Sequence, residues 1–302
     1  MASTADNFVL VKPMWGVLED LRPSQWQHLL DRVKSDGYDA IEFCCGPPGF
    51  GFRQDPDLAI QLIQKAGLKV ITLIITLGYP KPPGGRAEAH IADFKEQLKY
   101  ALRFQPILIN CHPGKDSFEA KEALQFFAAT SQIEKEIGVR ISHETHRQTI
   151  LCNPFVYRDL MNHLPHDVSI TADLSHWAVS LERCMSNTTD AEFWPAVLAD
   201  LSTRVVLIHA RVGWGQSPQV CDPEAPEHRA DVDAHLGWWD AIVEGMRARG
   251  VPVIIEVEFG PYPYLPALPF TMQPVVDLWS IRKKFGAKLR QRYMEPSSAV
   301  SQ

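Results

Sequence analysis

The sequence predicts an α/β chain that folds as a single (β/α)8 TIM barrel. Strand-like runs rich in Val and Ile alternate eight times with longer amphipathic runs, as repeated β-then-α units require. Polar residues follow the C-terminal ends of the predicted strands, and a barrel carries its active site at that face. No GxGxxG motif follows the first strand, so the dinucleotide fingerprint of an open, doubly wound sheet is missing.

The predicted elements follow one another without an evident domain boundary. A helix after the first strand opens at Ser24 and ends at Gly37, because Gly often follows the last helical residue. Apolar runs predict strands at 8–17, 38–44, 68–76, 106–112, 139–146, 168–176, 204–213 and 251–261. Further helices are predicted at 57–66, 86–104, 118–137, 154–163, 178–200, 232–249 and 271–290. We expect one domain over 1–302, with 293–302 as a flexible tail.

Composition sets bounds on compartment and partners. The chain is 45% hydrophobic and 22% charged, which is ordinary for a globular protein, and its net charge of −6 argues against sequence-independent nucleic-acid binding. Six cysteines without a CxxC pair imply no disulfide framework, which fits a reducing compartment. No secretory signal and no apolar run of membrane-spanning length are evident. We expect a cytoplasmic protein that binds neither nucleic acid nor membranes.

Four candidate metal ligands end four successive strand-like segments. They are Glu144 in VRISHETH, Asp173 in VSITADLSH, His209 in VVLIHARVG and Glu258 in VIIEVEFGP. Carboxylates and an imidazole that meet at one edge of a barrel form a site for a divalent metal, with Mn²⁺ preferred and Mg²⁺, Co²⁺ or Zn²⁺ as alternatives. Such an ion polarises a carbonyl and eases removal of the neighbouring proton, which flanking carboxylates can move.

Strand periodicity is consistent with all four ligands pointing inward. Side chains alternate across a strand, so an inward Glu144 implies that His143 points outward. The same alternation places Val205 on the inner face with His209.

The eighth strand offers two carboxylates on one face, Glu256 and Glu258. We prefer Glu258 as the ligand because it lies nearer the C-terminal end of the strand. Glu256 then lies one layer lower, where it can partner a ligand. A lone Glu at such a position is as often merely hydrogen-bonded, but four compatible residue types at equivalent positions favour metal binding.

These residues resemble those of the sugar isomerase/epimerase superfamily, whose members have a xylose-isomerase-like barrel. The resemblance covers the chain from YDAIEF to the last predicted helix. It implies that the metal ligands are Glu144, Asp173, His209 and Glu258. It further implies that Glu144 and Glu258 form the catalytic acid/base pair. The Asp-x-x-His step from Asp173 to His176 also matches and places His176 near the substrate.

Other polar residues are candidates for contacting a substrate. The superfamily often has a polar residue and a His on strand four, where this chain has Asn110 and His112. The full candidate set is His176, Arg211, His112, Glu42 and His146. Arg211 can pair with a ligand carboxylate or bind a substrate oxyanion. It follows His209 at a shorter spacing than the resemblance would lead us to expect, which argues against an ordinary ketose substrate.

We therefore expect a metal-dependent isomerase or epimerase of a sugar or keto-sugar-like small molecule, working by proton transfer through a metal-bound enediolate. A lyase or dehydratase that eliminates water or an aglycone from an oxidised sugar is the main alternative, since the predicted top loops are long and aromatic. An abasic-site DNA endonuclease with several zinc ions and a non-catalytic barrel are the remaining alternatives. The resemblance also implies a homo-oligomer.

Two further features are aromatic residues near the predicted barrel mouth and a basic stretch near the C-terminus. Aromatic residues at strand ends and in top loops can stack on a substrate or shield the barrel mouth; they are Trp15, Phe50, Phe52, Trp214, Tyr262 and Tyr264. The basic stretch 282–292 is expected to form a solvated helix face.

Overall fold

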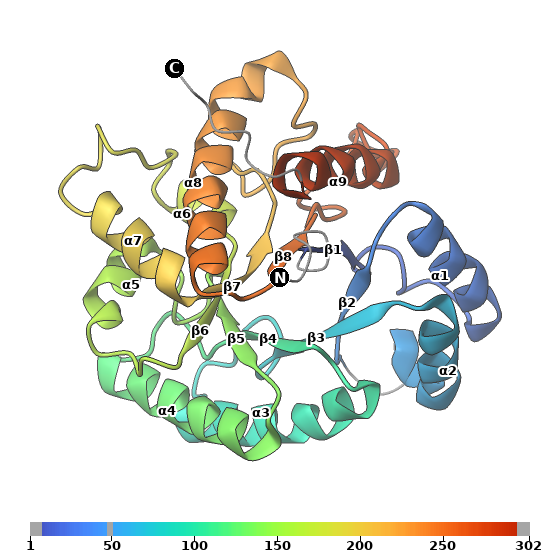
Figure 1. Cartoon of the computed structure of the whole chain (residues 1–302), viewed down its shortest axis with the longest axis horizontal. Helices are drawn as coiled ribbons and strands as arrows, with labels where there is room; N and C mark the ends of the chain where they lie inside the picture. The colour runs from blue at the N-terminus through green and yellow to red at the C-terminus, as the bar shows by residue number, and fades with distance from the viewer. Residues whose placement is uncertain (1–7, 47–50, 295–302) are drawn as a thin grey trace.

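Eight parallel strands close into one barrel (Figure 1) in the computed structural model, which describes residues 8–46 and 51–294. In chain order they are β1 (Phe8–Pro13), β2 (Ala40–Cys44), β3 (Lys69–Ile75), β4 (Leu108–His112), β5 (Ile141–Glu144), β6 (Ser169–Ala172), β7 (Val205–His209) and β8 (Val253–Glu256). Each strand pairs with the next, and β8 closes onto β1 from Phe8↔Val253 to Val11↔Glu256. The predicted fold class is confirmed.

Helices surround the barrel on its outside (Figure 1). They are α1 (Trp26–Ser35), α2 (Pro56–Ala66), α3 (Ala87–Ala101), α4 (Ala120–Ile137), α5 (Pro154–Met161), α6 (Ser175–Ser180), α7 (Trp194–Arg204), α8 (Arg229–Ala248) and α9 (Leu278–Met294). Local sequence explains the ends of α2: Asp55 accepts a hydrogen bond from Leu58 N at its start, and Gly67 closes it at φ 64. Within the described residues, no helix combines the length and apolar character needed to cross a membrane.

The last helix is displaced from its predicted place. α9 begins at Leu278 rather than near 271, because the preceding segment is proline-rich and Pro274 cannot donate a helical hydrogen bond. It then continues to Met294, which includes the first residues of the tail predicted from about 293. The rest of that tail, 295–302, lies outside the described residues, as does Phe50.

The barrel interior has an apolar lower layer and a polar upper one. The lower layer consists of strand residues, namely Val9, Val11, Ala40, Ile71, Leu108, Val206, Leu207 and Ile254. Above it, the inward positions one step nearer the C-terminal ends are polar, including Glu42, Asn110, His209 and Glu256. An active site at this face is the usual arrangement in such barrels.

Strand periodicity predicts whether His143 and Val205 point into or out of the barrel, and it is right for His143 and wrong for Val205. His143 points outward, as predicted: it lies 5.0 Å from the Phe127 ring of α4, and its Nε2 lies 3.1 Å from Thr130 Oγ1. Val205 was expected inside with His209, but it packs in the outer core between barrel and helices. The reason is a register shift between β6 and β7, which breaks the alternation before Leu207.

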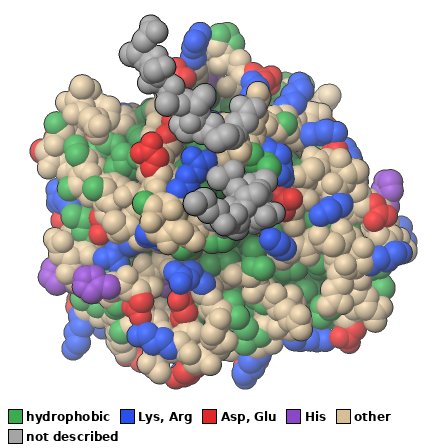
Figure 2. All heavy atoms as spheres, viewed as in Figure 1, with side chains coloured by type: hydrophobic (Ala, Val, Ile, Leu, Met, Phe, Trp, Pro, Cys, Tyr) green, Lys and Arg blue, Asp and Glu red, His purple; other side chains and the backbone are tan. Residues whose placement is uncertain are grey.

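Charges of both signs are mixed among the described residues on the face seen in Figure 2. Lys and Arg side chains are interspersed with Asp and Glu over this face. Elsewhere among the described residues, charged side chains form pairs, such as Arg290 with Asp39 at 2.5 Å and Arg292 with Asp240 at 2.5 Å. Exposed pairs of this kind contribute little to stability.

Candidate metal and substrate site

Four donor side chains converge at the C-terminal ends of β5 to β8. Glu144 and His209 are the last residues of β5 and β7. Asp173 directly follows β6, and Glu258 lies two residues beyond β8. One donor atom from each lies within 4.8 Å of the other three, and His209 Nδ1 lies 3.0 Å from Glu258 Oε2 and 3.4 Å from Glu144 Oε2. The structure thus brings the four predicted ligands together.

The donor set fits a divalent cation. Glu144 has no exposed surface, yet its Oε1 has no hydrogen-bond partner among the described residues. A buried carboxylate oxygen without a partner is costly. Of the three carboxylates, Asp173 and Glu258 pair with the Arg211 guanidinium, whereas Glu144 pairs with the imidazoles of His112 and His209. Oxygen-rich ligation with one imidazole suits the cations predicted from the sequence.

Burial and charge shift the protonation of two of these donors. Burial raises the pKa of Asp173 to about 7, although the Arg211 guanidinium opposes this. Burial alone would lower the pKa of His209, but the surrounding carboxylates, first Glu258 and Glu144, raise it well above its ordinary value. Without a cation, His209 is therefore protonated and Asp173 partly protonated near pH 7, and a metal would displace these protons.

Arg211 lies against the donor set. Its Nη2 contacts Asp173 Oδ2 and lies 2.7 Å from His176 Nε2, and its Nη1 lies 3.4 Å from Glu258 Oε2. Its Nε donates to Ser175 Oγ at 3.1 Å. The sequence left two roles open for Arg211. In the structure, Arg211 pairs with the candidate ligands Asp173 and Glu258. Its side chain also borders the cavity described below.

The other ring nitrogen of His209 faces a second pair of carboxylates. Nε2 lies 3.7 Å from Glu42 Oε1 and 3.8 Å from Glu256 Oε2. Burial, with Glu42 nearby, raises the pKa of Glu256 well above its ordinary value. Because a metal-bound His usually donates its free N–H to a carboxylate, this pair is placed to hold the His209 ring in position.

Three histidine rings pack in a row beside Glu144. The rings of His112 and His146 lie 4.3 Å apart, and those of His146 and His176 lie 3.9 Å apart. His112 Nε2 lies 2.9 Å from Glu144 Oε2. Burial lowers the pKa of all three histidines well below the ordinary value, so they are neutral near pH 7. His112, Glu144 and His146 also bring three donor atoms within 4.8 Å, a second group able to hold a cation.

Tyr79 was not predicted from the sequence. Its hydroxyl lies 3.0 Å from His112 Nδ1 and 3.1 Å from His146 Nδ1, so it links both rings. It lies four residues beyond β3, in the GYPKPPGG segment between β3 and α3. The one available signal is an aromatic residue shortly after a barrel strand.

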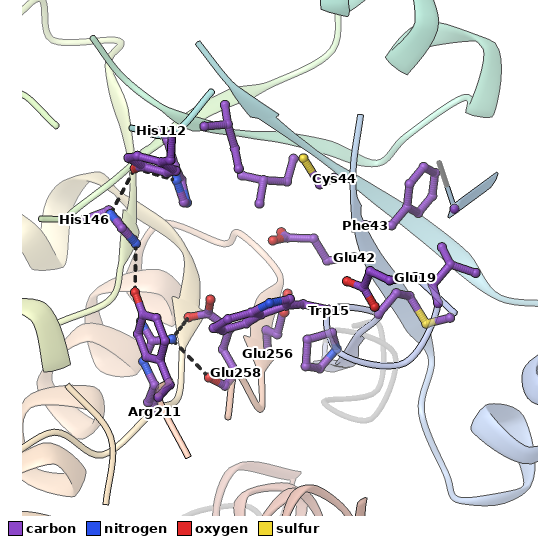
Figure 3. A pocket seen from close by; sticks show the side chains of 18 of the residues that line it. Trp15, Glu19, Glu42, Phe43, Cys44, His112, His146, Arg211, Glu256 and Glu258 are labelled. Atoms are coloured by element: carbon purple, nitrogen blue, oxygen red, sulfur yellow. Dashed lines mark hydrogen bonds and ion pairs between the residues drawn. The ribbon is translucent and has the colours of Figure 1, made fainter. Parts of the chain in front are cut away.

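A cavity of about 390 Å³ opens above these residues (Figure 3). His112, His146 and Arg211 border it on one side, with Phe43 and Cys44 opposite. Carboxylates of Glu42, Glu256 and Glu258 lie between them. The remaining wall is largely apolar and aromatic, and it includes Met14, Trp15, Leu18, Leu73, Ile75, Tyr79 and Tyr264.

Most predicted site residues gather at this cavity. Of the five candidates for substrate contact, His112, His146, Glu42 and Arg211 border it, whereas His176 lies behind Arg211 without exposed surface. Among the predicted aromatics, Trp15 and Tyr264 border the cavity. Phe52 instead packs in the core against Trp26, and Tyr262 is exposed.

Comparison with known proteins agrees with this architecture. No curated protein sequence matches the chain significantly. The fold is similar to a D-psicose 3-epimerase from Clostridium cellulolyticum H10, solved with D-tagatose (12% identity, 96% of this chain and 100% of that one, TM-score 0.57). It is also similar to the probable 3-DHS dehydratase AsbF from Bacillus anthracis (11% identity, 94% and 100%, TM-score 0.60).

A third similar structure is endonuclease IV from Thermus thermophilus (11% identity, 95% and 98%, TM-score 0.52). At these identities the likeness concerns the fold alone. The sequence itself matches the family model described as "xylose isomerase-like TIM barrel" over residues 30–268, which is more than half of the chain. The chain therefore belongs to the xylose isomerase-like TIM barrel family.

Proposed function

We propose that this protein is a metal-dependent isomerase or epimerase of a sugar or keto-sugar-like small molecule. The observation that carries the proposal is the convergence of Glu144, Asp173, His209 and Glu258 within 4.8 Å of one another, beside a cavity of about 390 Å³. Structural similarity to a D-psicose 3-epimerase agrees with it. The volume suits a single small ligand.

Each residue has a proposed role. Glu144, Asp173, His209 and Glu258 hold the cation, for which Mn²⁺ remains the first choice. When bound, such a cation polarises the oxygens of a hydroxy-ketone and so makes the neighbouring C–H more acidic. Arg211, His146, His112 and Glu42 bind substrate oxygens, and His176 orients Arg211 through its 2.7 Å contact. His112 also fixes the Glu144 carboxylate.

Glu144 and Glu258 are the proposed acid/base pair. Their donor oxygens lie within 4.8 Å of each other and Glu258 borders the cavity, so the proposal places the substrate carbon beside Glu258 with Glu144 behind it. One carboxylate removes the proton next to the carbonyl, and the other returns a proton to the same carbon or its neighbour. Return to the opposite face of the same carbon epimerises the substrate. Return to the neighbouring carbon isomerises it, provided that the hydroxyl proton of the first carbon also moves to the former carbonyl oxygen.

The experiment is a comparison of Glu144→Gln with the unchanged chain. Gln keeps the shape of Glu144 but cannot take up a proton, so turnover of keto-sugars should fall by at least about 10³-fold. Metal content, circular dichroism and melting temperature are measured on the same samples. Glu136→Gln, at an exposed position of α4, is the matched control and should keep full activity.

Activity close to normal in Glu144→Gln would contradict the acid/base assignment. A protein that takes up no divalent metal, even after reconstitution, would contradict the cation site itself. Elemental analysis of the Asp173→Asn and Glu258→Gln variants checks the same site, since each removes a charged ligand.

Elimination is the second candidate function, and the apolar cavity wall favours it. Met14, Trp15, Leu18 and Phe43 would border a substrate on the side away from the histidines. Sugar hydroxyls gain nothing from such a wall, whereas an apolar or aromatic substituent does. The same base could then remove a proton next to a keto group while the substituent leaves. Mass spectrometry separates the two reactions, since epimerisation conserves mass and elimination releases a second product.

A further inference from the structure

An ordered apolar hairpin projects between β8 and α9. Residues 266–275 form it, with an antiparallel bridge between Ala267 and Pro274. Leu268 N donates to Gln273 O at 2.8 Å. The base is fixed because Leu265 is buried and Tyr264 packs edge-on against Trp15 at 5.0 Å. The hairpin is therefore anchored at the cavity and free at its tip.

The tip exposes large apolar side chains together. Eight large hydrophobic side chains are exposed in the described residues, and five of them lie in the hairpin or just before it: Tyr262, Leu268, Phe270, Met272 and Val275. Phe270 is 104% exposed and Met272 is 53% exposed. Both have positive φ, 66° and 56°, which bulky residues rarely adopt. Single exposed apolar residues are normal, but a contiguous group marks an interaction site.

Charge indicates the kind of partner. No charged residue or histidine occurs in 259–276, although the whole chain has a net charge of −6. Two copies of an acidic chain repel each other unless they meet through an uncharged surface. A two-fold contact places each residue of a patch near its own counterpart, so a patch for self-association must avoid like charges. This segment meets that requirement.

Prolines determine how such a contact forms. Pro266, Pro269 and Pro274 lack an N–H, so the hairpin is a poor edge for adding another strand. Side chains must therefore make the contact. A free aromatic side chain offers about 150–250 Å², so the five exposed residues present on the order of 500 Å². That is more than half of the roughly 800 Å² that each partner buries in a stable complex.

We propose that the hairpin is a self-association surface, on which a second copy of this chain packs its own hairpin across a two-fold axis. Phe270 and Met272 lie at the centre of the contact, and Leu268, Val275 and Tyr262 surround them. The proposal is independent of the reaction that the cavity catalyses, because Phe270 and Met272 do not border the cavity.

The test is sedimentation equilibrium of the full chain over a micromolar concentration range. The unchanged chain should behave as a dimer. The double variant Phe270→Asp/Met272→Asp places four like charges at the centre of the contact and should raise the dimer dissociation constant by about 30-fold or more, the loss typical of interface hot spots. Ile107→Asp is the control, because Ile107 is 40% exposed but precedes β4, at the opposite end of the barrel.

The expected result is a dimer for the unchanged chain and for Ile107→Asp, and a folded monomer for the double variant. Circular dichroism verifies the fold. If the charged variant is unfolded, Phe270→Ala/Met272→Ala decides the matter in its place, since it removes the same apolar surface without adding charge. A monomeric unchanged chain would overturn the proposal and assign the hairpin to a different partner. A dimer that survives the folded double variant would overturn it as well.

Discussion

His209 meets carboxylates at both of its ring nitrogens. Nδ1 faces Glu144 and Glu258, and Nε2 faces Glu42 and Glu256. If Nδ1 ligates a cation, Nε2 carries the proton, and carboxyl oxygens of Glu42 and Glu256 face it at 3.7 and 3.8 Å. Glu256 therefore has a proposed positioning role, distinct from that of the ligand Glu258.

Replacing Glu256 by Gln tests this role at the residue scale. Gln keeps the volume but replaces one carboxyl oxygen by an NH2 group, which cannot accept the Nε2 proton, so metal affinity should fall about 10- to 100-fold, as for other partners of ligating histidines. Isothermal titration with Mn²⁺ measures the change. Glu258→Gln should lose more affinity, because it removes a ligand. Equal losses in the two variants would contradict the distinction between Glu256 and Glu258.

The donor residues could be predicted because their signal is local. A carboxylate or His at the end of an apolar run identifies both the strand and the position, and alternation then gives its direction, as His143 illustrates. Tyr79 and Val205 depend on distant parts of the chain. Tyr79 acquires its role from His112 at the end of β4 and His146 beyond β5, and Val205 turns outward because of pairing with β6.

At the scale of elements, α9 shows that a basic composition does not by itself predict exposure to solvent. Its basic stretch was expected to face solvent, but Arg282 is fully buried. The Arg282 guanidinium donates to the carbonyls of Phe259 at 2.6 Å and Trp15 at 2.8 Å. Those carbonyls belong to loops after β8 and β1 that lack strand partners, so a buried Arg satisfies them. The prediction of a solvated face was wrong for this residue.

The packing of β1 against α9 also buries an amine. Lys12 has no exposed surface, its Nζ has no hydrogen-bond partner among the described residues, and it lies 3.8 Å from the Trp279 ring centre. Burial, together with Arg282, lowers the pKa of Lys12 to about 6. The amine is therefore neutral in the folded chain at pH 7 but protonated in the unfolded chain. From about pH 10 down to 6, folding releases a proton, so this residue destabilises the fold increasingly as pH falls.

Lys12→Met should stabilise the protein. Met has similar length and can keep the contact with Trp279, while the cost of deprotonating a buried amine disappears. The free energy of unfolding should rise by on the order of 2–4 kcal/mol at pH 7, and the gain should shrink toward pH 10. Urea denaturation at both pH values measures it. Lys65→Met on exposed α2 is the control, expected within about 0.5 kcal/mol of the unchanged chain. A gain that does not depend on pH would contradict the explanation.

Over the whole molecule, the barrel concentrates negative charge at one end. Glu42, Glu144, Asp173, Glu256 and Glu258 are carboxylates of the central site, and Arg211 is the guanidinium beside them. The cation-free chain can offset this charge by keeping protons on Asp173, Glu256 and His209, as their raised pKa values indicate. Protons and a divalent cation therefore compete for one site.

Because of this competition, the stability of the cation-free chain and that of the cation-loaded chain should depend on pH in opposite directions. Asp173 and His209 have higher pKa values folded than unfolded, so in the cation-free chain they stabilise the fold at low pH. The stabilisation that Asp173 contributes is lost as pH rises from about 4 to about 7. The stabilisation that His209 contributes is lost as pH rises past the raised pKa of its imidazole. The cation-loaded chain needs both groups deprotonated. Its stability therefore increases as pH rises over the same range.

Cation affinity should therefore fall by at least about ten-fold per pH unit below pH 7, because one or more protons must leave. The difference in melting temperature between Mn²⁺-loaded and EDTA-treated protein should widen from pH 6 to pH 8. Titration calorimetry in two buffers with different ionisation enthalpies counts the protons released. Asp173→Asn should bind more weakly and release fewer protons. Affinity that is equal at pH 6 and pH 7, without proton release, would contradict competition at this site.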